Sequence, residues 1–178
     1  MKSIVANSAL TTTSIVLLAA MLVSAPMAPE ARSAQPEIDN LPFAQLQPLG
    51  NSPSNTAEFR ERPLLLQFWA SWCHSCSAIM FDLDELLEKY PGTDYLAIST
   101  DDEQDDARQY IKKHSLYQKY NDRYFIDQGK LLATKLGVET IPTIILLDAA
   151  GNEVVRKSGH LNSADLQQFS SAMKENQE

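Results

Sequence analysis

Apolar and polar positions alternate in regular blocks over most of the chain. Residues 63–70 (PLLLQFWA) form a nearly continuous apolar run, which is typical of a strand buried on both faces of a sheet. Residues 79–90 carry apolar side chains at helical spacing and are closed by Pro91–Gly92. The pattern predicts a second buried strand at residues 94–100 and a helix within residues 101–114, whose acids precede its lysines.

The C-terminal part of the chain continues this alternation. Residues 129–138 predict a short helix, and the apolar run at 144–147 and the segment 153–156 flank a turn and predict a hairpin. An amphipathic helix is expected at residues 162–174, with Asn162 or the following serine as its N-cap. The expected order is βαβα, a short helix and then ββα. Such an order implies a right-handed parallel crossover and, because of the late hairpin, a mixed sheet.

The N-terminal part has a different character. Residues 14–25 (SIVLLAAMLVSA) form an apolar segment behind a weakly basic start, which is the layout of an export signal. We therefore interpret residues 1–25 as a cleaved signal peptide or a retained membrane anchor. The proline-rich residues 26–40 are interpreted as a linker. Residues 41–178 then form one domain, whose first 15 residues or so predict a short edge strand or hairpin.

Composition and charge narrow the possible partners. The chain has 178 residues, of which 44% are hydrophobic and 21% are charged, and this is enough apolar material for a single core. The formal net charge of −8 argues against nucleic acid or an anionic membrane surface as the main partner.

The two cysteines, Cys73 and Cys76, are the only ones in the chain, and both lie in the stretch FWASWCHSC. They could form a redox couple, a metal clip or a structural staple. Export would place them in an oxidising compartment, where disulfides persist. A bridge across so short a loop removes little chain entropy, so the staple is the weakest of the three interpretations.

A helix that begins with Cys-x-x-Cys directly after a strand is suited to thiol–disulfide chemistry. The helix N-terminus favours a thiolate, and the thiolate is the species that attacks disulfides. We expect Cys73 to lie at the exposed start of the helix and attack, and Cys76 to lie beneath it and resolve the mixed disulfide. His74 would tune the thiolate, Trp72 would contact the client, and Trp69 would belong to the core.

A second motif, ETIPT, follows about 65 residues after the cysteines. Proline directly before a buried strand removes a donor of the sheet ladder. A cis bond between Ile141 and Pro142 would solve this problem by forming a tight turn. In that turn the backbone of Ile141 would be free to pair with an extended client peptide.

The motifs FWASWCHSC, GVETIPT, LLDAAGNEV and the later SGH together resemble the thioredoxin fold. More narrowly, they are similar to the exported TlpA/ResA/DsbE-type thiol–disulfide oxidoreductases. The resemblance covers about residues 41–174. It implies a thioredoxin-like α/β three-layer sandwich, with a mixed central sheet and flanking helices.

The resemblance also implies roles for individual residues. By analogy, Cys73 is the nucleophile, Cys76 is the resolving cysteine, and the two form a redox-active disulfide. Pro142 is the cis-proline that faces them, with Ile141 beside it. The loop at Ser158–Gly159 corresponds to the third wall of the client-binding surface.

Two further positions are read from this resemblance. His160 would lie near the third wall of the client-binding surface. Gln67 stands six residues before the first cysteine, where thioredoxins proper carry a buried aspartate that handles protons. An amide cannot titrate, so Gln67 is expected to tune the site differently, and an amide at this position is frequent in the exported branch.

The function expected from this resemblance is extracytoplasmic protein-disulfide reduction by dithiol–disulfide exchange. Clients would be protein thiols and disulfides, such as apocytochrome c or copper-site cysteines, and a membrane thiol donor would recycle the dithiol. The expected location is the periplasm or the outer face of the inner membrane. No cofactor and no nucleic-acid partner are expected. A disulfide oxidase or isomerase of the same fold is the alternative within this class.

A copper-binding metallochaperone is the alternative from a different class. Cys73, Cys76 and the histidines at 74, 114 and 160 are the candidate ligands for copper or zinc. A structural zinc site needs four ligands, commonly from two cysteine pairs, and copper chaperones of the Sco type space their cysteines by three residues. We therefore expect no metal. The acidic run at 101–106 lacks the pattern of a calcium loop and is expected to be a helix start with solvated carboxylates.

Overall fold

The structure of the protein is a computed structural model, in which the predicted signal or anchor and the linker (residues 1–40) lie outside the described residues. The described residues are 41–53, 56, 59, 62–114 and 118–176.

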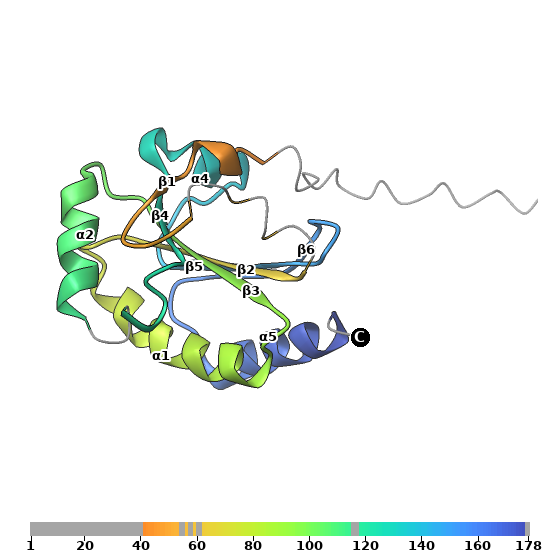
Figure 1. Cartoon of the computed structure of the whole chain (residues 1–178). Coiled ribbons are helices and arrows are strands. Elements are labelled where there is room, and N and C mark those ends of the chain that lie inside the picture. The colour runs from red at the N-terminus through yellow and green to blue at the C-terminus, as the bar shows by residue number, and fades with distance from the viewer. Residues whose placement is uncertain (1–40, 54–55, 57–58, 60–61, 115–117, 177–178) are drawn as a thin grey trace, which may run out of the picture. The chain divides into compact units, whose positions relative to one another are not determined.

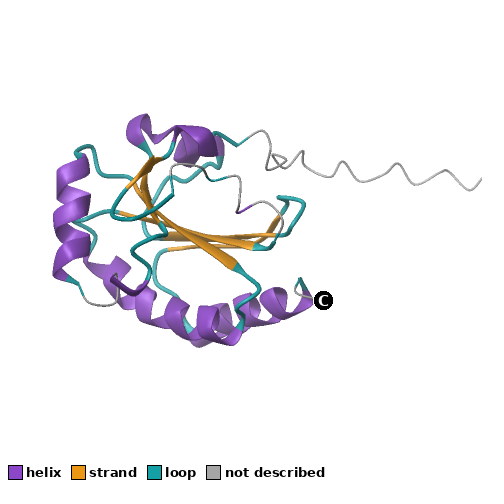
Figure 2. Cartoon of the chain, viewed as in Figure 1, coloured by secondary structure: helices purple, strands orange, loops and turns teal. Residues whose placement is uncertain are grey.

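A six-stranded mixed sheet forms the centre of the domain (Figure 2). Its spatial order is β1-β4-β3-β2-β5-β6. The neighbours β2, β3 and β4 run parallel, whereas β5 and β6 continue the sheet antiparallel on one side and β1 on the other. The mixed sheet predicted from the sequence is therefore confirmed. The strands are β1 (Gln47–Pro48), β2 (Leu64–Trp69), β3 (Asp94–Ser99), β4 (Tyr124–Ile126), β5 (Thr143–Leu147) and β6 (Glu153–Ser158).

Helices cover both faces of this sheet. Figure 1 shows α1 and α5 on one face, α4 on the other, and α2 beside the sheet at the β1–β4 end. This is the three-layer arrangement that the resemblance implied. The helices are α1 (His74–Lys89), α2 (Gln104–Lys113), α4 (Leu131–Lys135) and α5 (Ser163–Glu175), with single 3₁₀ turns η2 (Phe43–Gln45) and η4 (Gln128–Lys130).

The central strand β2 explains why there are two cores. Successive side chains of a strand point to opposite faces. Leu65 and Trp69 pack in the cluster that contains the buried residues of α1 and α5, whereas Leu66 and Phe68 pack in the cluster of α4 and η2. Every residue of β2 is buried, as its continuous apolar run predicted.

Side chains fix the starts of two helices. Asn162 caps α5 by accepting hydrogen bonds from the backbone N–H groups of Ala164 and Asp165, and the Asp165 carboxylate accepts in return from the Asn162 N–H. This reciprocal capping box satisfies donors that a helix start otherwise leaves unpaired. The buried Asp127 does the same for α4, because its carboxylate accepts from the N–H groups of Leu132 and Ala133.

Two expectations from the sequence are corrected by the fold. Strand β4 was not predicted, because three residues are too short a run to show a period; the strand exists because Ala97–Ser99 of β3 pair with it. The acidic run at 101–106 does contain the start of a helix, since α2 begins at Gln104 and Asp105 and Asp106 stand in its first turn. The expectation of solvated carboxylates is wrong for Asp101, which is only 4% exposed.

Candidate active site

The two cysteines lie where the central strand turns into a helix. Strand β2 ends at Trp69, and the backbone N–H of Cys73 donates to the carbonyl of Ala70 at 3.0 Å, which closes a tight turn. Helix α1 begins at His74, so Cys73 occupies its N-cap position. The predicted strand–turn–helix arrangement around the cysteines is therefore present.

Cys73 and Cys76 form a disulfide, with 5.5 Å between their Cα atoms. Cys76 is fully buried and Cys73 is 5% exposed. Cys73 is therefore the more exposed of the two residues, but it is less exposed than the sequence predicts, because Ala70 of the preceding turn and Ile141 pack in the same cluster.

The start of helix α1 is one feature near the disulfide that favours a thiolate at Cys73 once the bond is reduced. No acidic residue stands in the first turn of α1, and a helix start presents unpaired N–H groups and partial positive charge. The hydroxyl of Ser75 lies 3.7 Å from the Cys73 sulfur. His74 is exposed at the first helical position of α1.

The loop before β5 and the loop after β6 lie side by side at one end of the strands, the end at which β2 leads to the cysteines. The Ile141–Pro142 peptide bond is cis. Thr143 pairs with Phe68 of β2 on one side and with Ser158 of β6 on the other. The N–H of Gly159 donates to the carbonyl of Pro142 at 2.8 Å. Ser158–Gly159 therefore lies beside Pro142, at the end of the sheet where β2 leads to the cysteines. The exposed His160 follows this loop.

Ile141 stands next to an open cavity. Among the described residues, the backbone N–H and C=O of Ile141 have no hydrogen-bond partner. Its half-buried side chain packs against the cluster that contains both cysteines. Together with Trp72, which is 64% exposed, Ile141 lines a cavity of about 480 Å³. The remaining lining residues are Thr100, Lys130, Ala133, Thr134, Val138, Glu139 and Thr140.

Gln67 is completely buried on the α1 side of the sheet. The hydroxyl of Tyr95 donates to its Oε1, and the same hydroxyl lies 3.2 Å from the sulfur of Met80. Within the part of the chain that the structure describes, the Nε2 of Gln67 has no hydrogen-bond partner. The position that carries an aspartate in thioredoxins proper is thus an uncharged amide tied to a tyrosine.

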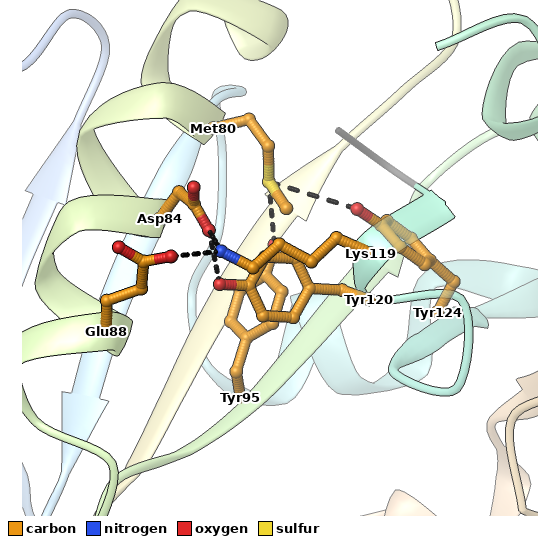
Figure 3. Close-up of polar contacts among 7 residues, drawn as sticks. All are labelled: Met80, Asp84, Glu88, Tyr95, Lys119, Tyr120 and Tyr124. Atoms are coloured by element: carbon orange, nitrogen blue, oxygen red, sulfur yellow. Dashed lines mark hydrogen bonds and ion pairs between the residues drawn. The ribbon is translucent and has the colours of Figure 1, made fainter. Parts of the chain in front are cut away.

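A polar cluster extends from Met80 along α1 (Figure 3). Lys119 donates to Asp84 and, at 2.6 Å, to Glu88, while the hydroxyl of Tyr120 donates to Asp84. Burial raises the pKa of Asp84, but the hydrogen bonds from Lys119 and Tyr120 lower it overall. Burial and the bond to Asp84 raise the pKa of Tyr120 to about 12.

One residue that touches the active-site turn was not predicted from the sequence. Asp101 follows β3, and its carboxylate accepts hydrogen bonds from the backbone N–H of Ser71 at 3.0 and 3.1 Å. Asp101 is the first residue of the acidic run at 101–106, and nothing in the sequence pattern distinguishes it from the exposed acids after it.

The metal alternative finds no ready-made site in the described residues. No group of three or more histidine, cysteine, aspartate or glutamate side chains is placed to hold a metal ion in that part of the chain. No described helix has the length and apolar character that crossing a membrane requires.

Comparison with known proteins identifies the family. The family model described as thioredoxin-like matches residues 61–154, which is more than half of the chain. The chain therefore belongs to the thioredoxin-like family. It is 34% identical over 110 residues to the thiol:disulfide interchange protein DsbE of Vibrio cholerae, and 26% identical over 114 residues to the thiol–disulfide oxidoreductase ResA of Bacillus thuringiensis.

The matches cover 62% of this chain and 57% of the Vibrio protein, and 63% of this chain and 64% of the Bacillus protein. Among solved structures, a secreted Mycobacterium tuberculosis disulfide oxidoreductase homologous to E. coli DsbE superimposes with a TM-score of 0.56 at 18% identity. That match covers 74% of this chain and 96% of the mycobacterial one. It confirms the thioredoxin-like fold that the sequence predicted.

Proposed function

We propose that this chain is an extracytoplasmic thiol:disulfide oxidoreductase that reduces protein disulfides through Cys73 and Cys76. The observation that carries the proposal is the position of the two sulfurs. They are bonded to each other at the start of α1, at the same end of the sheet as Pro142. The names of the Vibrio and Bacillus relatives support the same chemistry.

The reaction proceeds in two successive thiol–disulfide exchanges. The Cys73 thiolate attacks one sulfur of a client disulfide, the client S–S bond breaks, and one client thiolate leaves. The Cys76 thiol then loses its proton and attacks Cys73 in the mixed disulfide, which releases the second client thiolate. The client gains two electrons, and the protein is left with the Cys73–Cys76 disulfide.

The client binds as an extended segment over Pro142. The backbone of Ile141, which has no hydrogen-bond partner in the described part of the chain, supplies hydrogen bonds of the kind that an edge strand offers to a peptide. Trp72 covers one side of the bound segment, and Ser158–Gly159 forms the other wall. The carbonyl of Pro142 is already held by Gly159, so the two loops act as one rigid platform.

The direction of electron flow, the location and the partners are parts of the same proposal. A membrane thiol donor returns the disulfide to the dithiol, and the clients are cysteines awaiting haem or copper. The mycobacterial protein of similar fold is secreted, and this agrees with the export signal expected at residues 1–25.

The test is reduction of insulin disulfides by dithiothreitol in the presence of catalytic amounts of the protein. Cys73→Ala is expected to lower turnover to the uncatalysed rate. Cys76→Ala, reduced and then freed of dithiothreitol before insulin is added, is expected to trap a mixed disulfide with the client, seen as a mass increase that a reductant removes. Glu85→Ala, an exposed change on the same helix, should leave turnover unaltered.

A Cu(I) titration separates this proposal from the metallochaperone. The reduced protein is titrated with Cu(I), and free thiols are then counted. Tight stoichiometric binding that protects both cysteines, together with no insulin reduction, would overturn the oxidoreductase assignment. Turnover that depends on Cys73 would instead support it.

A further inference from the structure

One buried carboxylate lies directly behind the turn that carries Cys73. Asp101 is 4% exposed, and its side-chain oxygens accept from the N–H of Ser71 at 3.0 and 3.1 Å, from the Ser71 hydroxyl at 2.8 Å and from the Ser99 hydroxyl at 2.7 Å. Each of these groups donates its hydrogen bond to the carboxylate. Among the described residues, no lysine or arginine forms an ion pair with it.

Hydrogen bonds to Ser71 and a short stretch of chain hold the carboxylate near the reactive sulfur. Ser71 is two residues before Cys73, and two residues span at most about 7 Å of chain. The turn is anchored further because the N–H of Thr100 donates to the carbonyl of Trp69 at 2.8 Å. The charge of Asp101 therefore lies on the order of 10 Å from the Cys73 sulfur.

Other charged groups near the site are exposed. His74 follows Cys73 on α1, and His160 follows the loop after β6. Lys130 and Glu139 line the cavity beside Trp72. Asp102, the neighbour of Asp101, is 86% exposed and pairs with Lys130 at 3.0 Å. Solvent and the ion pair with Lys130 screen the charge of Asp102. The charge of Asp101 is screened much less, because its side chain is buried and has no ion pair among the described residues.

We propose that Asp101 is a positioning residue that also keeps the cysteine couple reducing, because its buried charge opposes the charge of the Cys73 thiolate. Destabilising the thiolate destabilises the reduced form relative to the disulfide, so the dithiol gives up its electrons more readily. Asp101 thus counteracts the start of α1, which favours the thiolate. This inference rests on the proposed function, in which Cys73 reacts as a thiolate.

The decisive experiment compares Asp101→Asn with Asp102→Asn, two adjacent changes that each remove one negative charge. The reduced proteins are alkylated with iodoacetamide between pH 5 and pH 9, and modification of Cys73 is followed by mass. Alkylation of the Asp101→Asn protein at pH 5.5 should be on the order of tenfold faster than wild type, since one charge at about 10 Å acts on the thiolate fraction. The rates should converge at pH 9, and Asp102→Asn should change them less than twofold.

Convergence at high pH distinguishes a change in thiolate fraction from a change in access to the sulfur. Asp101→Ser serves as a second neutral variant if the asparagine protein does not fold, and Asp101→Glu retains the charge. Faster alkylation at low pH with Asn or Ser but not with Glu supports the proposal. A rise with Glu as well, or equal effects at positions 101 and 102, would overturn it.

The equilibrium with glutathione gives an independent measure. At a pH where Cys73 is ionised, Asp101→Asn should shift the equilibrium about tenfold towards the dithiol, which is about 30 mV for a two-electron couple. An unchanged equilibrium there would refute the redox role. Because neither measurement uses a client, both are separate from the insulin assay, whose failure would refute the proposed function itself.

Discussion

The two ends of helix α1 differ in how their side chains are held. At its start, Cys73 caps the helix without a side-chain hydrogen bond to the backbone, the first turn has no acid, and Trp72 projects into solvent. Further along, Asp84 and Glu88 are tied to Lys119 and Tyr120 (Figure 3). The helix is thus anchored by polar contacts away from the chemistry, and the reactive end carries few contacts that would compete with a client.

This difference separates stability from activity along a single helix. Changes at the start should alter turnover and leave stability unchanged, whereas changes in the anchored part should do the reverse.

Trp72→Ala should lower kcat/KM for insulin reduction by about tenfold, because large exposed aromatic side chains commonly supply much of the binding energy of a contact surface. With 64% of Trp72 exposed, little of it packs in the core, so the melting temperature should stay within about 2 °C of wild type. Phe81→Ala is a matched control, since Phe81 is also 64% exposed but lies two turns further along α1. Equal losses of activity in both variants would contradict a client surface centred on Trp72.

Asp84→Asn should lower the free energy of unfolding by about 1 kcal/mol, because Lys119 and Tyr120 lose a charged acceptor that is only partly screened. Urea unfolding measures this change, and insulin turnover should remain at the wild-type level. Asp82→Asn on the same helix is the control and should have no effect. A loss of turnover in Asp84→Asn would show that the two ends of α1 are not independent.

The pH dependence of stability should report the same cluster, with a smaller effect. The folded-state pKa of Asp84 is lowered from 3.8, so its contribution is complete above that value and is lost as the pH falls through the folded pKa. The pKa of Tyr120 is raised from 10.0 to about 12, so its contribution is complete below pH 10 and is lost as the pH rises towards 12.

Urea midpoints of wild type and Tyr120→Phe measure the alkaline limb. The difference between the two proteins should narrow between pH 10 and pH 12. A difference that stays constant over this range would mean that the contacts with Asp84 and Lys119 do not raise the pKa of Tyr120 in the folded protein.

The elements around the cysteines were predictable because each carries a strong local signal. The continuous apolar run of β2, the helical spacing of α1 and the proline before β5 each define their element without knowledge of their neighbours. The cap of α5 at Asn162 was equally visible, since such residues compete for unpaired N–H groups wherever a helix starts.

The features that the sequence did not reveal depend on contacts between distant segments. Strand β4 has three residues and acquires its pairing from β3. Asp101 looks like its exposed neighbours, and only the approach of Ser71, 30 residues earlier, makes it a buried acceptor. The bond between Gln67 and Tyr95 likewise joins two strands that are 28 residues apart in the chain.

The reduction potential of the Cys73–Cys76 couple distinguishes a reductase from an oxidase. The protein is equilibrated with defined ratios of reduced and oxidised glutathione, and its two thiols are counted after acid quenching. We predict one two-electron transition with a potential well below about −120 mV, the value typical of a strong periplasmic oxidant. A potential near that value would contradict the assignment as a reductase and identify an oxidase.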